Sequence, residues 1–165
     1  MDGKYYRPTT RLRKLQSFKV AEFQRKFFGT LLRSKDCSIK MVMSFMNPIN
    51  LSDKKITLKP FLLEYSEEHL AGEDHDSVKW LSEGESTIES VQNWIKRNET
   101  SWKNDGPIFN FAIFNEENKL VGMVEANSDV NVNSRMAEGD INISYGIYPK
   151  FRGHGYATAA VNLMV

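Results

Sequence analysis

Residues 145–158 constrain the fold more than any other stretch of the 165-residue chain, because a strand pattern is followed directly by a glycine-rich turn and a helix start. Gly153 and Gly155 can adopt backbone angles that other residues avoid, and they let a ligand approach the backbone closely. The helix that follows offers unpaired N–H groups and the positive end of its dipole. The segment therefore predicts a phosphate-binding turn, to which Arg152 adds a fixed positive charge.

Two other phosphate-binding motifs do not fit this turn. A P-loop has a Lys followed by Ser or Thr after its glycines, and no such pair follows Gly155. The dinucleotide-binding fingerprint needs a third glycine, and Thr158 occupies that place. An ordinary strand-to-helix turn without a ligand stays open as the alternative.

The composition predicts a soluble globular chain that is long enough for one domain with a sizeable core. No run of about 18 apolar residues is present, and the N-terminus lacks a compact apolar secretory core, so we expect no membrane span and a cytoplasmic location. Cys37 is the single cysteine. It has no partner for an internal disulfide or a zinc site, and we expect a reduced thiol and no bound metal.

The charge is distributed unevenly between two parts of the chain. Residues 1–40 carry 11 Lys and Arg against 3 Asp and Glu, whereas residues 41–165 carry 11 against 18. We therefore expect a basic N-terminal extension at residues 1–50 and a partial domain at residues 51–165. The extension is expected to add little to the stability of the domain.

The basic extension has several interpretations. Its apolar spacing is compatible with an amphipathic helix that touches anionic surfaces, with a targeting peptide, or with sequence upstream of a start at Met41, Met43 or Met46. The plainest interpretation is an extension with no conserved fold. Its aromatic residues from Phe18 onward are phenylalanines at helical spacing, which favours packing over base stacking. We expect no specific nucleic-acid partner.

An ordered pattern of helices and strands begins at Ile56. Ser86 and Glu89 fit a capping box that opens a helix with the apolar stripe Ile88, Val91, Trp94 and Ile95. The expected elements are a strand at 56–61, a helix at 66–81 with Trp80 and Leu81 at its buried end, the capped helix, a turn at 105–107, strands at 108–114 and 120–126 around a hairpin turn at 115–119, a polar loop at 127–139 and a strand at 141–148.

The string from Arg152 to Ala157 fits the pattern Arg/Gln-x-x-Gly-x-Gly/Ala and, with Pro149 before it, closely resembles the acyl-CoA signature of the GNAT family of N-acetyltransferases. The resemblance extends over roughly residues 56–165, and the order strand, two helices, three strands, helix is the opening order of that family. It implies an α/β (α+β) acyl-CoA N-acyltransferase-like fold, with a mixed, mainly antiparallel sheet flanked by helices.

In that family the core continues past the signature helix with another strand, a helix and usually two more strands. This chain ends at Val165, inside the expected signature helix. The resemblance therefore implies a domain whose C-terminal part is missing, including one wall of the CoA cleft and the helix that often supplies a tyrosine to protonate the thiolate.

The resemblance also assigns cofactor-binding candidates. Backbone groups near Ile147 and Tyr148 would pair with the pantetheine arm, and the N–H groups of the turn would hold the pyrophosphate. His154 is expected to contribute its backbone N–H and to expose its ring, whereas the side chains of Tyr145 and Ile147 are expected in the core. The full set of candidates is Ile147, Tyr148, Arg152, Gly153, His154, Gly155, Tyr156, Ala157 and Thr158.

Acyl transfer to an amine needs a base, donors for the oxyanion and an acid for the thiolate. Along the strand at 141–148, residues 140, 142, 144 and 146 share one face and are expected to face the cleft. Many GNAT relatives place a glutamate at or beside the position that is Asn142 here, so the expected base is absent or displaced. The candidate catalytic residues are Glu125, Glu138, Asp140 and Asn142.

The sequence thus indicates an N-acetyltransferase that moves an acetyl group from acetyl-CoA to a primary amine of a small molecule or protein. Acidic residues around the first helix hint at a cationic acceptor or form a solvated face. The alternative is a truncated, non-catalytic CoA-binding or vestigial module. A homodimer stays open as the assembly.

Overall fold

The computed structural model describes residues 50–81, 86–129, 131, 136, 137 and 139–165. The N-terminal extension up to residue 49 and Glu138 lie outside these residues. Within the described part, no helix has the length and apolar character needed to cross a membrane.

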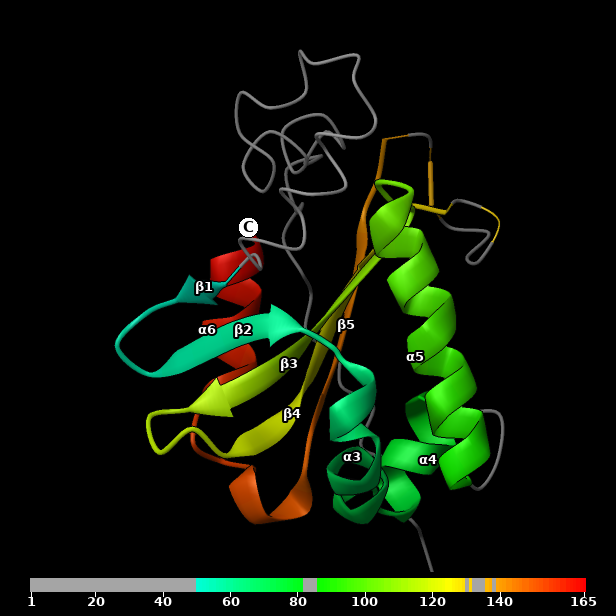
Figure 1. The fold of residues 1–165 in the computed structure, drawn as a ribbon. Coiled ribbons are helices and arrows are strands. Elements are labelled where there is room, and N and C mark those ends of the chain that lie inside the picture. Colours follow the sequence, from blue (N-terminus) through cyan, green and yellow to red (C-terminus); the bar gives the residue numbers. More distant parts are fainter. Residues whose placement is uncertain (1–49, 82–85, 130, 132–135, 138) are drawn as a thin grey trace, which may run out of the picture.

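Five antiparallel strands form one sheet in the order of the sequence (Figure 1). They are β1 (Leu51–Ser52), β2 (Ile56–Pro60), β3 (Ile108–Asn115), β4 (Leu120–Asn127) and β5 (Asn142–Ile147). The helices are α3 (Ser66–Gly72), α4 (His75–Leu81), α5 (Ile88–Lys103) and α6 (Tyr156–Met164), with short 3-10 turns η2 (Leu63–Tyr65) and η3 (Pro149–Phe151). All five strands therefore pair with sequence neighbours.

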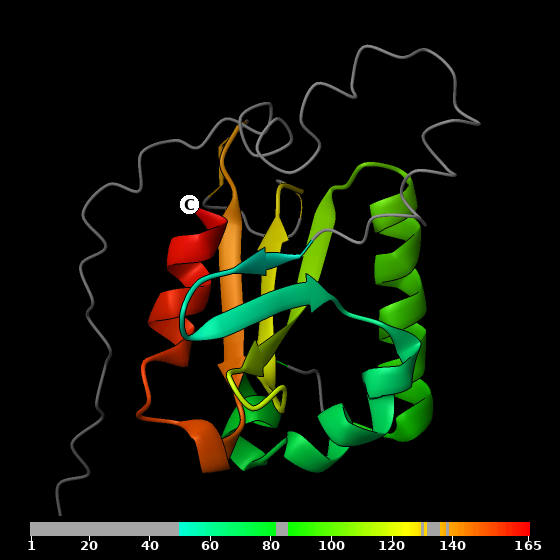
Figure 2. The ribbon, with the colours of Figure 1, turned by 60° about the vertical axis from the view of Figure 1, so that its left-hand side comes forward.

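Both faces of the sheet are covered, and Figure 2 shows α5 and α6 on opposite sides. On one face, Ala160 and Met164 of α6 pack with Val124 and other residues of the sheet. On the other face, Val91 and Ile95 of α5 pack with the alternate residues of β3 and β4. Because both faces are buried, β3 and β4 consist almost entirely of buried residues rather than alternating with exposed polar ones.

The single helix predicted at 66–81 is wrong, because the chain forms two helices there. Glu73 is extended, with φ −69° and ψ 148°, and ends α3. The Asp74 carboxylate then accepts a hydrogen bond from the Ser77 N–H at 2.9 Å, which caps the start of α4. The burial expected of Trp80 and Leu81 concerns side chains outside the described part.

The predicted capping box was displaced by one residue. The N-cap of α5 is Thr87, whose side chain accepts from the Ser90 N–H at 3.1 Å, while the Ser90 hydroxyl accepts from the Thr87 N–H at 2.8 Å. Because the N-cap is Thr87 and not Ser86, the N3 position falls on Ser90 instead of Glu89, and the Ser90 hydroxyl makes the reciprocal bond. Ile88 is 38% exposed and is not part of the buried stripe, which begins at Val91.

Candidate functional site

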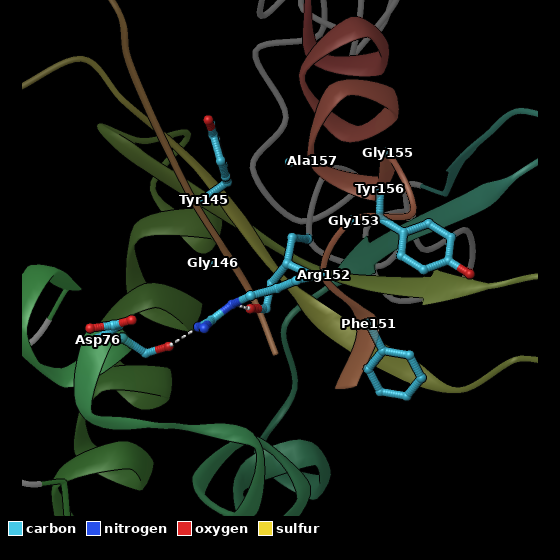
Figure 3. A pocket seen from close by; sticks show the side chains of 11 residues that line it. Asp76, Tyr145, Gly146, Phe151, Arg152, Gly153, Gly155, Tyr156 and Ala157 are labelled. Carbon is cyan, nitrogen blue, oxygen red and sulfur yellow. Dashed lines mark hydrogen bonds between the residues drawn. The ribbon is translucent and has the colours of Figure 1, made fainter. Parts of the chain in front are cut away.

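A groove of about 460 Å³ lies where the end of β5, the start of α4 and the turn into α6 meet (Figure 3). Six of the nine predicted cofactor-binding residues line it, whereas Tyr148, His154 and Thr158 do not. The lining residues are Asp76, Ser77, Tyr145, Gly146, Ile147, Phe151, Arg152, Gly153, Gly155, Tyr156 and Ala157.

The turn has the backbone that its glycines predict. Gly153 and Gly155 have φ values of 78° and 75°, in the left-handed region that favours glycine. Gly155 is the N-cap of α6 and supplies no side-chain cap. The N–H groups of Tyr156, Ala157 and Thr158 belong to the first turn of α6, where a helix offers no acceptor of its own. An anion in this place would meet several backbone donors together.

His154 is exposed, as expected, and its ring also braces the turn. Nδ1 lies 2.8 Å from the Arg152 carbonyl oxygen and the ring stacks on Tyr156 with centroids 5.7 Å apart. The Thr158 side chain is exposed, and the Tyr156 ring packs into the core under α6. The side chains of His154 and Thr158 therefore do not line the groove, whereas Tyr156 borders it as well as packing in the core.

The backbone of Tyr148 is directed into the chain rather than into the groove. Its N–H donates to the Val121 carbonyl at 3.0 Å, and its carbonyl accepts from the Phe151 N–H at 2.8 Å. Backbone groups alternate in direction along a strand, so those of Tyr145 and Ile147 point away from β4. Because β5 is the edge strand of the described sheet, these groups face the open side.

The core packing expected of the Tyr145 side chain is wrong. This side chain is 50% exposed and lines the groove (Figure 3), whereas Ile147 packs against the core as expected. An edge strand has a neighbour on one side only, so a large ring there extends beyond the cover of α6. A tyrosine at this position is thus available to a ligand.

Arg152 is engaged by partners that the sequence did not indicate. Its two terminal nitrogens donate to the two carboxylate oxygens of Asp74, both at 2.8 Å, and Nε donates to the Ile147 carbonyl at 2.9 Å. One terminal nitrogen also lies 3.3 Å from the Ser77 hydroxyl. The hydrogen bonds from Arg152 and then Ser77 hold the pKa of Asp74 well below its ordinary value.

Lys55 brings a second positive charge to the turn. Its Nζ lies 5.6 Å from the centroid of the Tyr156 ring and 3.4 Å from the place where a Cβ on Gly155 would stand. The Asp53 carboxylate accepts from the Lys55 N–H at 2.7 Å and so fixes the hairpin between β1 and β2. The spacing of the sequence does not indicate this approach. Lys55 comes near the turn only because the folded sheet places the β1–β2 hairpin beside it.

The candidate catalytic residues are separated from one another, and none of those described lines the groove. Glu125 pairs across the sheet with Asn110 on one side and Ser144 on the other. Burial raises the pKa of Glu125, and the neighbouring Asn110 amide partly opposes this rise. The exposed Asn142 lies on β5 opposite Asn127. The Asp140 carboxylate accepts from the Ala137 N–H at 2.8 Å in the preceding loop.

A buried contact fixes α3 against the end of β5. His69 Nδ1 lies 2.8 Å from the Tyr148 hydroxyl, and the imidazole stacks on Trp94 with centroids 5.4 Å apart. A Cβ on Gly72 would stand 2.6 Å from the Tyr148 ring, so α3 approaches this ring as closely as a glycine permits. Burial lowers the pKa of His69 to about 4, and the ring is neutral at physiological pH.

Residues 55–165 match the family model described as the acetyltransferase (GNAT) domain. The chain therefore belongs to the GNAT acetyltransferase family, as the signature from Arg152 to Ala157 predicts. The predicted fold class is also confirmed, since a mainly antiparallel sheet flanked by helices is the GNAT architecture. No curated protein sequence matches the chain significantly.

Solved structures of several acetyltransferases have a similar fold. A GNAT-family acetyltransferase from Bacillus anthracis is 23% identical, with a TM-score of 0.54 over 69% of this chain and 62% of its own. RimL, a ribosomal L7/L12 α-N-protein acetyltransferase, is 14% identical, with a TM-score of 0.56 over 70% and 61%. FdhC, a nucleotide-linked sugar GNAT, is 20% identical, with a TM-score of 0.51 over 71% and 64%. The chain spans less than two thirds of the length of each.

Within the described ranges, no group of three or more His, Cys, Asp or Glu side chains is arranged to hold a metal ion.

We expect the free energy of unfolding to fall as the pH is lowered from 6.5 to about 4, because of His69. In this window the unfolded chain protonates His69 while the folded ring stays neutral, so the unfolded state binds more protons and stability rises with pH. The lowering of the His69 pKa from 6.5 to about 4 corresponds to a loss of about 3 kcal/mol at most in the free energy of unfolding.

Urea unfolding of the parent and His69→Gln at about pH 7 and about pH 4.5 measures this contribution. Gln keeps a polar partner for Tyr148 but does not titrate. The stability difference between the two proteins should therefore shrink at the lower pH, and a difference that is equal at both pH values would contradict the assignment.

Proposed function

We propose that the chain binds acetyl-CoA in the groove and transfers its acetyl group to a primary amine of a small molecule or protein. The observation that carries this proposal is the left-handed turn at Gly153 and Gly155, which presents the first N–H groups of α6 beside an open strand edge. A diphosphate needs several converging donors, and this turn supplies them without a side chain in the way.

The proposed binding mode divides the cofactor between the turn and the strand. The N–H groups from Gly153 to Thr158 hold the pyrophosphate, and Lys55 adds charge beside them. The outward backbone groups of Tyr145 and the outward N–H of Ile147 pair with the pantetheine amides. The Ile147 carbonyl is held by Arg152 Nε, and the backbone groups of Tyr148 are bonded to β4 and η3. Bound in this way, acetyl-CoA supplies the activated thioester.

Among the candidate bases, we propose Glu125 as the group that takes the amine proton, directly or through water. Its buried position raises its pKa, which brings a carboxylate closer to the range in which general bases are effective. Asn110 on β3 and Ser144 on β5 are its cross-strand neighbours. Asp140 is less suited, because its carboxylate is already bonded to the Ala137 N–H.

The acceptor proposed is a cationic amine. Exposed carboxylates of Glu64, Glu67 and Glu68 lie at the start of α3 and in the turn before it, and they would attract positive charge. RimL, named as a protein α-N-acetyltransferase, and FdhC, named as a nucleotide-linked sugar GNAT, represent the protein and small-molecule classes that the proposal includes. A cytoplasmic location, where acetyl-CoA is available, belongs to the same proposal.

The second candidate function is a CoA-binding module without turnover. It is favoured by one observation, namely that no described catalytic candidate lines the groove.

Gly155→Val is expected to abolish CoA binding measured by calorimetry, because its side chain strains a left-handed backbone and obstructs the phosphate. His154→Ala is the matched control in the same turn. It loses the ring's contact with the Arg152 carbonyl and its stacking on Tyr156 but keeps its backbone N–H, and we expect CoA affinity within about threefold of the parent. Equal binding by Gly155→Val and the parent would show that the turn is only structural.

Glu125→Gln is expected to slow acetyl transfer by about a hundredfold or more, the usual contribution of a general base, without changing CoA affinity. CoA thiol release from acetyl-CoA measures this with three amines: a peptide with a free N-terminus, an amino sugar and a polyamine. Ser144→Ala is the matched neighbour and should retain most of the turnover.

Unchanged turnover in Glu125→Gln would exclude Glu125 as the base. If the parent binds CoA but releases no thiol with any of the three amines, the second candidate function is the better account.

A further inference from the structure

The Arg152 guanidinium, which the signature places at the groove, already has hydrogen-bond partners within the protein. Four of the five N–H donors of an arginine side chain are engaged here: one on Ile147, two on Asp74 and one on Ser77. The pair is nonetheless accessible, with 40% of the Arg152 side chain and 28% of the Asp74 side chain exposed. Arg152 and Ser77 both line the groove, so a ligand there would meet this contact.

Asp74 belongs to a different part of the fold from the turn that it restrains. It lies between α3 and α4 and caps α4 through the N–H and hydroxyl of Ser77, at 2.9 Å and 2.6 Å. The ion pair therefore joins the start of α4 directly to the turn between β5 and α6. Among the described ion pairs, it alone connects the α3–α4 segment with that turn.

A diphosphate bound in the groove would compete with the Asp74 carboxylate for the Arg152 guanidinium. A phosphate accepts bidentate hydrogen bonds from the planar guanidinium as a carboxylate does, and the diphosphate as a whole carries two negative charges against one. The bound diphosphate would also lie near two carboxylates, because Asp76 lines the groove and Asp74 adjoins it. Repulsion between these like charges favours moving the Asp74 carboxylate away from Arg152. The Arg152–Asp74 pair is bidentate, but it is open to water and salt, which weaken an ion pair, so a phosphate can replace the carboxylate.

Resting on the proposed function, we propose that Asp74 competes with CoA for Arg152, and that binding exchanges the Asp74 carboxylate for a phosphate on the guanidinium. The exchange releases the start of α4 from the turn. The position of the α3–α4 segment, which carries the acidic residues proposed to attract the acceptor, then depends on whether CoA is bound. Asp74 acts through Arg152 and is a positioning residue.

Calorimetry with CoA on Asp74→Asn tests the exchange. Asparagine keeps the size and the helix cap but loses the charge. If the closed pair restrains Arg152 as strongly as exposed pairs usually do, its loss should tighten CoA binding about two- to fivefold. Asp76→Asn removes the same charge from the first turn of α4, two residues further along the chain, without a bond to Arg152, and a smaller change is expected.

A double-mutant cycle shows whether the Arg152–Asp74 ion pair is broken or kept when CoA binds. Asp74→Asn and Arg152→Gln, singly and together, are compared by urea unfolding with and without saturating CoA. We expect a coupling between the two positions in the free protein and its disappearance with CoA. A coupling that persists with CoA, or CoA binding by Asp74→Asn that is no tighter than that of Asp76→Asn, would overturn the exchange.

The outcomes also distinguish this inference from the proposed function. CoA binding by the parent with no gain in Asp74→Asn refutes the exchange and leaves the proposed function standing. CoA binding by neither protein refutes both. Binding by Asp74→Asn alone would support the exchange in its strongest form.

Discussion

The structure depends on the left-handed turn that joins β5 to α6. Two glycines with positive φ reverse the chain within a few residues, in a left-handed conformation that most other residue types adopt only with strain. The reversal places the N-terminal end of α6 beside the strand edge, while Tyr156, Ala160 and Met164 fix the helix on the sheet. Packing on one side of α6 thus orients the polar end that a phosphate would meet.

The electrostatics of the groove arise from tertiary structure. Asp74 comes from the α3–α4 junction, Lys55 from the first hairpin and Arg152 from the turn itself. A lysine and an arginine are near the phosphate position, and of these two residues only Arg152 has a carboxylate partner among the described ion pairs. The affinity for an anionic ligand would therefore depend on the α3–α4 junction as well as on the signature residues.

The sequence predicts the local features of this fold well, because they depend on short-range chemistry. The glycine turn, the strands β3 and β4 and the hairpin between them follow from residue types and alternation. The division of the helix at 66–81 was missed, since the Asp74 cap competes with a continuous apolar pattern. Tyr145 was misplaced for another reason: alternation assigns it a face, but only the neighbours of β5 decide whether that face is covered.

The candidate site was predictable where the backbone makes it and not where side chains meet from distant segments. The turn from Gly153 onward could be recognised from its motif, whereas the pairing of Arg152 with Asp74 and the approach of Lys55 have no signal in the spacing of the sequence. Glu125 could be named as a strand-end carboxylate, but its raised pKa depends on burial by elements that pack on it. The roles proposed for these residues stay predictions.

The measurement that tests the account most directly is a titration of the isotope-labelled chain with CoA, followed through the NMR signals of its backbone amides. If the turn holds the pyrophosphate, the largest shifts should occur at the N–H groups from Gly153 to Thr158, followed by Tyr145 and Ile147 at the strand edge. Inorganic pyrophosphate alone should shift the turn but not the strand. Shifts concentrated elsewhere, or none at the turn, would contradict the account.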